Sequence, residues 1–154
     1  STPIKSSAAS DVYKRQHKEY SFSLQTTRGI NAGSPYYGIR SVYDGRYRYI
    51  VNLTPEATFQ NVETKSPLFK KWKSLAETDS HAKAMTIKYQ HRPAIELYDV
   101  KNDPYCMKNL AEDAKQASTI SRLDKELKRW MKDCGDEGQP TEMRAFEHMP
   151  GKRK

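Results

Sequence analysis

The sequence predicts an α+β domain, in which an antiparallel sheet of about four strands carries a long C-terminal helix on one face. Two observations predict this class. Segments with two-residue alternation of apolar and polar side chains lie in the first half of the chain, and the strongest helical pattern lies toward its end. The 154 residues give room for one ordinary domain.

The first strands flank a loop and a hairpin. Residues 20–24 alternate aromatic and aliphatic side chains, which predicts a strand, and a loop rich in Gly, Asn, Ser and Pro follows. Residues 36–43 and 46–53 flank the dipeptide Asp44-Gly45. This dipeptide predicts a two-residue hairpin turn, because glycine tolerates a positive φ.

Two short helices and a fourth strand come next. Ser66-Pro67 supplies an N-cap and a proline at the first helical position. Asp79 or Ser80 caps the second helix, which Pro93 ends. Residues 95–100 then predict a strand.

The last helix has the clearest pattern. Apolar side chains recur every three or four residues from Ile120 to Cys134, and Gly135 is placed to end the helix. The pattern predicts a buried Cys134 thiol. We therefore expect one domain over residues 17–136, followed at 137–154 by a polar tail that is mobile or docks on a surface absent from this chain.

Residues 1–16 are set apart from this domain. Residues 6–16 back-translate, with ordinary codons, into the mosaic-end adapter of transposase-based sequencing libraries. We treat residues 1–16 as an adapter artefact and expect the protein to continue upstream of His17. The alternative is a genuine flexible basic arm.

Composition narrows the function classes. Lys and Arg total 27 against 19 Asp and Glu, and this net charge of +8 suits a polyanionic partner. No apolar run reaches the length of a membrane span, and the polar start is unlike a signal peptide. Two cysteines are too few for a disulfide scaffold or a four-thiolate zinc site.

The sequence offers no catalytic or metal-binding motif. The four histidines match no ligand spacing, and both common glycine-rich phosphate loops are missing. The one stretch with a nucleic-acid-binding composition is Arg-Tyr-Arg-Tyr at 46–49. A period of two sends its arginines and tyrosines to opposite faces, which favours a packed tyrosine face, so we expect no nucleic acid partner.

Several segments together resemble the C-terminal region of sulfatases. They are residues 36–42, 44–47, 50–52, 96–99, 102–104 and 109–111. The insertion Ser66-Pro67-Leu68-Phe69 and Arg92 resemble the heparan N-sulfatases (sulfamidases) and their bacterial relatives in particular. The resemblance runs from about Tyr20 to Asp136.

This resemblance implies the smaller, C-terminal subdomain of an alkaline-phosphatase-like enzyme, leaning on a large N-terminal catalytic domain. In that family a formylglycine, made from the first residue of a C/S-x-P-S/A-R motif, works beside a calcium ion. Neither Cys106 nor Cys134 fits the motif. We therefore expect no cofactor, metal or catalytic residue in this chain, which alone should be inactive, and assign calcium and formylglycine to the missing catalytic domain.

The resemblance also implies a site and a location. The loop after the first strand corresponds to a region near the pocket rim, which makes Thr26, Thr27 and Arg28 candidates for contact with a sulfated glycan. The Arg28 guanidinium suits a sulfate or carboxylate. The alternative is a loop arginine that faces solvent or an inter-subdomain carboxylate. The resemblance implies a periplasmic or extracellular location, since related sulfatases are usually exported to the periplasm or reach lysosomes.

Two other hypotheses stay open. A free-standing basic module would bind RNA or sulfated polysaccharide with a steep salt dependence. An accessory protein would instead pair with a separately encoded catalytic chain. The exact substrate, and the choice between N-sulfate and O-sulfate, is not determined by these residues.

Overall fold

The computed structural model describes residues 19–27, 33, 36–145 and 147. Its sheet has four antiparallel strands in the order β1-β2-β3-β4. Their bounds are β1 Ser21–Gln25, β2 Ile39–Tyr43, β3 Tyr47–Asn52 and β4 Ile95–Asp99. The predicted α+β class and the number of strands are therefore confirmed.

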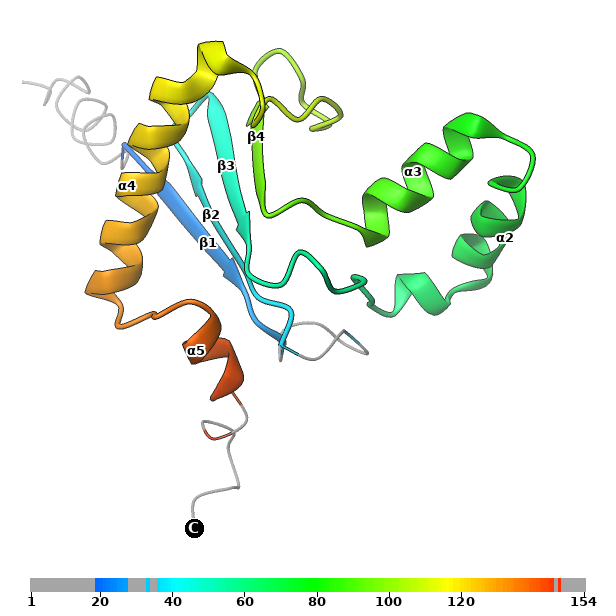
Figure 1. The fold of residues 1–154 in the computed structure, drawn as a ribbon, viewed down its shortest axis with the longest axis horizontal. Coiled ribbons are helices and arrows are strands. Elements are labelled where there is room, and N and C mark those ends of the chain that lie inside the picture. The colour runs from blue at the N-terminus through cyan, green and yellow to red at the C-terminus, as the bar shows by residue number, and fades with distance from the viewer. Residues whose placement is uncertain (1–18, 28–32, 34–35, 146, 148–154) are drawn as a thin grey trace, which may run out of the picture.

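The helices fall into two groups (Figure 1). Helices α2 (Pro67–Leu75) and α3 (Ser80–Gln90) lie in the connection between β3 and β4 and extend beyond the β4 side of the sheet. Helices α4 (Ala117–Asp133) and α5 (Gln139–Met143) follow the sheet. Short 3-10 turns occur at Glu63–Lys65 and Ala114–Gln116. Among the helices described, none has the length and apolar character needed to cross a bilayer.

The predicted helix caps form. The Ser66 hydroxyl accepts a hydrogen bond from the backbone N–H of Phe69 at 3.1 Å, with Pro67 at the first helical position. The Asp79 carboxylate accepts one from the N–H of Ala82 at 2.7 Å. Each cap satisfies one of the N–H groups that the first helical turn leaves without a partner.

The hairpin turn lies one residue later than predicted. The N–H of Asp44 donates to the carbonyl of Tyr47 at 3.2 Å, which makes Gly45 and Arg46 the two central residues of the turn. The Asp44 carboxylate accepts from the N–H groups of Arg46 and Tyr47 at 2.9 and 2.7 Å. These two hydrogen bonds favour aspartate at the position before the two central residues of the turn. Gly45, the first central residue, takes the positive φ of 91°.

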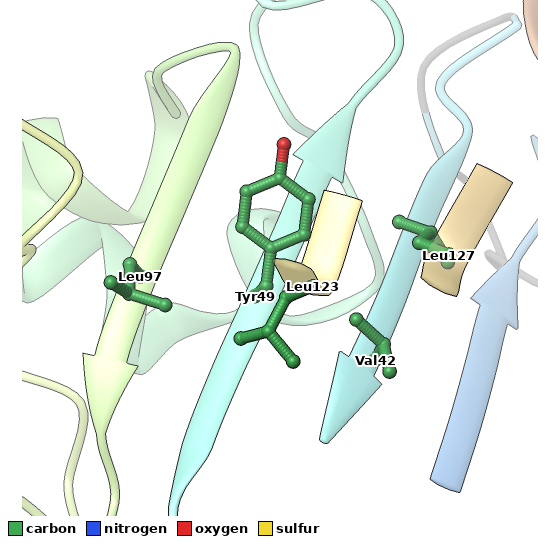
Figure 2. Close-up of a cluster of buried hydrophobic side chains, with 5 residues drawn as sticks. All are labelled: Val42, Tyr49, Leu97, Leu123 and Leu127. Carbon is green, nitrogen blue, oxygen red and sulfur yellow. The ribbon is translucent and has the colours of Figure 1, made fainter. Parts of the chain in front are cut away.

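The main core lies between the sheet and α4. Figure 2 shows its buried side chains, which come from three strands and the helix: Val42, Tyr49, Leu97, Leu123 and Leu127. Each is at most 1% exposed. Trp130 stacks on Phe22 of β1 with ring centroids 5.1 Å apart, so the helix also reaches the first strand. The apolar stripe of α4 is therefore what fixes the helix to this face.

The opposite face of the sheet carries a smaller apolar cluster. Tyr37 and Phe59 pack edge to face with centroids 5.2 Å apart, and Ile39 and Ala57 pack against them. Phe59 lies in the connection after β3, so this cluster holds that connection against the sheet. Toward β4 this face carries both apolar and polar side chains, among them Ile50, Glu96 and Tyr98.

Two expectations for the end of the chain differ from the structure. Cys134 is exposed, because α4 ends at Asp133 and Gly135, with a φ of 69°, turns the chain away from the sheet. Within the expected polar tail at 137–154, residues Gln139–Met143 form α5, whose Glu142 is only 1% exposed. The expected artefact at 1–16 lies outside the described residues.

Truncating the α4 stripe should destabilise the chain. We expect Leu127→Ala to lower the free energy of unfolding by about 2–5 kcal/mol, since it removes buried methyl groups and leaves a cavity. Lys125→Ala, on the exposed side of the same helix, should change it by less than about 0.5 kcal/mol. Urea unfolding followed by circular dichroism measures both, and equal losses would contradict this account of the core.

Candidate functional site

The predicted rim residues follow β1. Thr27 is 9% exposed, and its backbone N–H donates to Glu142 Oε2 of α5 at 3.1 Å. Its hydroxyl is buried and has no hydrogen-bond partner within the described part of the chain. Thr26 lies directly after the last residue of β1, and Arg28 lies outside the described residues. Their contact with substrate stays a prediction.

A network of buried charged side chains fixes the backbone at Thr27, where the loop after β1 begins. The Arg40 guanidinium, whose side chain is 1% exposed, donates to Glu142 Oε1 at 2.8 Å and to the carboxylate of Asp136. It also donates to the backbone carbonyls of Gln25 and Ile39 at 3.3 and 3.1 Å. One guanidinium thereby joins β1, β2 and the segment that leads into α5. We call Arg40, Asp136 and Glu142 the Arg40 network.

The charges of the Arg40 network stabilise one another. Burial by itself raises the pKa of Asp136, but hydrogen bonds from Arg40 and from the N–H of Gly138 hold this pKa below its usual value. Gly38 permits the approach of Glu142, because a Cβ at this position would lie 2.5 Å from Glu142 Cγ. The residue directly before β2 is therefore a glycine, where the Glu142 side chain passes close to the backbone.

Sequence reasoning did not identify the Arg40 network. A signal existed, since Arg40 alternates with Val42 and shares its face of β2, which is the face that α4 covers. A buried arginine requires carboxylate partners. No sequence pattern pointed to Asp136 and Glu142 as those partners, because they lie 96 and 102 residues away along the chain.

A second network lies on the opposite face of the sheet. The Glu96 carboxylate accepts two hydrogen bonds from the Arg92 guanidinium, at 2.8 and 3.1 Å. It also accepts from the Asn52 amide at 2.7 Å and from the Tyr98 hydroxyl. Burial raises the pKa of Glu96, but these hydrogen bonds, that from Arg92 first, lower it below its usual value. Every acceptor position of this buried carboxylate is thus used.

This second network borders a groove, which we call the sheet–α3 groove. Its volume is about 440 Å³. Its floor includes Arg48 and Ile50 of β3, α3 contributes Met85 and Lys88 to one wall, and Tyr105 lies in the loop after β4. Aromatic and sulfur-containing side chains make up much of its surface, which suits apolar contact more than proton transfer.

Two polar groups that line the groove, the Tyr98 hydroxyl and the Lys88 ammonium, are engaged within the protein. Burial and the hydrogen bond to Glu96 raise the pKa of the Tyr98 hydroxyl, which keeps it protonated at neutral pH. The Lys88 ammonium donates to the carbonyls of Cys106 and Met107 at 2.8 and 2.6 Å, so its donors point to the loop. Across the described ranges, no group of three His, Cys, Asp or Glu side chains could hold a metal ion.

The Arg-Tyr-Arg-Tyr stretch divides between the faces as predicted. Tyr49 lies in the core under α4, while Arg48 lines the groove on the opposite face. Arg46 is at the turn and pairs with Asp99 at 2.7 Å. The stretch therefore does not form a continuous surface of aromatic rings and cations on which bases could stack.

Comparison with known proteins gives a consistent match. Two curated proteins of Formosa agariphila, both described as ulvan-active sulfatases, align with the chain. One is 32% identical over 108 residues, covering 68% of this chain and 18% of the relative. The other is 30% identical over 117 residues, covering 76% and 22%. The chain is similar to sulfatases over part of its length. It spans about a fifth of the length of these relatives.

The chain was also compared with solved structures and with protein-family models. The solved structure of the sulfatase yidJ from Bacteroides fragilis aligns with 86% of this chain and 20% of its own, at 17% sequence identity and a TM-score of 0.46. No protein-family model matches the chain. The two curated relatives support the resemblance to sulfatases. Its narrower assignment to the heparan N-sulfatases stays a prediction.

Removing the centre of the Arg40 network should cost much more than removing a surface pair. We expect Arg40→Met to lower the free energy of unfolding by about 3–5 kcal/mol, because it leaves two buried carboxylates without a cation. Arg122→Met breaks a pair whose arginine is 45% exposed, and should cost less than about 1 kcal/mol. Urea unfolding of both variants tests this, and similar losses would contradict a central role for Arg40.

Acid should weaken the fold through these carboxylates. The pKa values of Asp136 and Glu96 are lowered in the folded state, so the stability they contribute is present above their unfolded pKa of about 4 and is lost as pH falls below it. We expect the free energy of unfolding to be steady from pH 7 to about 5 and to fall below that. Arg92→Met should reduce the fall. Urea titrations at stepwise pH measure it, and an unchanged slope in the variant would refute the assignment to Glu96.

Proposed function

We propose that this chain is the C-terminal part of a sulfatase whose catalytic domain lies upstream. The observation that supports this most is the match to two ulvan-active sulfatases at 30% identity or above, over a region that is about a fifth of their length. The α+β fold agrees with the subdomain that the sequence resemblance implies. The proposed reaction of the whole protein is hydrolysis of a sulfate ester or sulfamate on a sulfated glycan, with a sulfamidase-like enzyme as the narrower form.

The catalytic cofactors of that reaction are proposed to lie in the upstream domain. Attack on a sulfuryl group requires an activated nucleophile and concentrated positive charge around the departing oxygens. The sequence has no C/S-x-P-S/A-R motif, and the described acidic residues do not cluster as metal ligands. We therefore assign formylglycine and calcium to the upstream domain, and we derive no chemical step from these residues.

The proposed contribution of this part is positional. The Arg40 network holds the backbone at Thr27, and the loop predicted to reach the pocket rim begins there. The hydrogen bond to Glu142 sets the position of the Thr27 backbone. Thr26, Thr27 and Arg28 are proposed to contact the substrate, and the hydrogen bond from Thr27 to Glu142 of α5 is proposed to position them. A periplasmic or extracellular location is proposed with the activity.

The free-standing module for RNA or sulfated polysaccharide has less support. Its argument was the basic composition and the Arg-Tyr-Arg-Tyr stretch, and the structure divides that stretch between two faces of the sheet. Among the cations in and beside this stretch, Arg46 and Arg122 are already paired with Asp99 and Asp44.

The decisive experiment begins with the source DNA. Long-read sequencing across the codon for His17 should reveal an open upstream frame that encodes the formylglycine motif, and the longer protein should release sulfate from a sulfated polysaccharide such as ulvan. The 154-residue chain should release none. A variant of the longer protein with alanine at the formylglycine position is the control, because it should fold and stay inactive.

Two results would overturn the proposal. One is a start codon followed by a genuinely encoded segment 6–16, because the chain would then have no upstream catalytic domain. The other is tight binding of RNA by the isolated chain with a steep loss of affinity as salt rises, which is the signature of a polyanion-binding module.

A further inference from the structure

The sheet–α3 groove exposes large apolar side chains. Tyr105 is 85% exposed, Met107 50%, Trp72 45% and Tyr89 37%, and all four line the groove. The opposite face of the sheet has its apolar side chains buried under α4. An apolar concave surface of this kind on one side of a small domain indicates a contact that the described residues do not supply.

The three cationic side chains of the groove differ in whether they are free to pair with a ligand. Arg92 is held by Glu96, and Lys88 donates to two carbonyls of the loop after β4. Arg48 has no carboxylate partner among the described residues, and its guanidinium lies 5.9 Å from the Tyr43 ring centroid. The groove therefore offers one available cation within a mainly apolar surface.

This combination suits a polypeptide better than a sulfated sugar. A sulfated sugar needs several free cations and hydroxyl-binding groups, and here two of the three cations already serve the protein itself. Side chains such as Met85, Ile50 and Met107 instead match the aliphatic and aromatic side chains of another polypeptide surface.

We propose that the sheet–α3 groove is the surface on which the rest of the longer protein docks, through a segment with apolar side chains and a carboxylate that pairs with Arg48. This inference rests on the proposed function, because it requires an upstream polypeptide. The chain spans only about a fifth of its sulfatase relatives, so most of the surface available to cover the groove lies outside it. The docked carboxylate replaces water at Arg48, and the apolar segment covers Tyr105 and Trp72.

The two cysteines provide a direct test. Cys106 lines the groove and is partly buried, while Cys134 is exposed at the end of α4 and does not line it. In the isolated chain both thiols should react with iodoacetamide. In the longer protein the labelling rate of Cys106 should fall at least about tenfold, because a thiol under a packed interface reacts only when the interface opens. Cys134 should keep its rate.

Peptide mass spectrometry of the labelled protein separates the outcomes. Equal labelling of Cys106 in the isolated and longer forms overturns the proposal. Protection of Cys106 that appears in the isolated chain only at high concentration also overturns it, because a second copy of the chain would then occupy the groove. Labelling does not require catalysis, so an inactive longer protein with a protected Cys106 would refute the proposed function and leave the docking surface standing.

A pair of substitutions gives a second readout. Tyr105→Ser should leave the Tm of the isolated chain within about 1 °C, since this side chain is 85% exposed, and should lower the apparent Tm of the longer protein by about 2 °C or more. Arg48→Glu should behave in the same way, because it places a carboxylate opposite the docked one. Lys125→Glu, an equal charge reversal on the outer side of α4, should leave both forms unchanged. No difference between Arg48→Glu and Lys125→Glu in the longer protein would refute the pairing at Arg48.

Discussion

The buried guanidinium of Arg40 is the interaction on which the rest of this structure depends. An arginine side chain that is 1% exposed cannot stay charged without carboxylates, and here Asp136 and Glu142 supply two of them. The same side chain bonds the carbonyl of Gln25 at the end of β1. The end of β1, the second strand and the segment after α4 are consequently fixed relative to one another by one charge. The Arg40 network thus fixes the arrangement of the segments at one end of the sheet. Packing of α4 against the apolar core covers the rest of that face.

Much of the fold followed from local patterns. The stripe of α4 and the caps at Ser66 and Asp79 depend on side chains within a few residues of one another, so the sequence alone was enough to predict them. The hairpin was placed correctly, but its central residues were shifted by one, because the decisive feature was the Asp44 carboxylate binding the turn from the position before it. The prediction that the Cys134 thiol is buried was wrong, because the residue lies just beyond the last residue of α4. Periodicity continues past the point where the helix ends and the packed surface stops.

The site was harder to predict because its contacts are distant along the chain. The groove brings together β3, α3 and the loop after β4, and no periodic pattern indicates that these segments share a concavity. The sequence placed Glu96 on a strand. Its hydrogen bonds from Arg92, Asn52 and Tyr98 depend on the pairing register of β3 and β4 and on the path of the chain between them. The resemblance to sulfatases supplied what the local patterns did not, namely that this sheet is part of a larger protein. It did not indicate which face of the sheet meets the larger part.

The connection that carries α2 and α3 has a consequence for how such domains diversify. Strands β3 and β4 are neighbours in the sheet although both helices lie between them in sequence. Because the entropy of closing a loop grows only with the logarithm of its length, by about 0.6 kcal/mol per doubling, this connection can gain or lose a helix with little effect on the pairing of the two strands. The sheet and α4 can thus remain constant while the wall of the groove is rebuilt. A single insertion point between two paired strands lets the contact surface change independently of the framework that supports it.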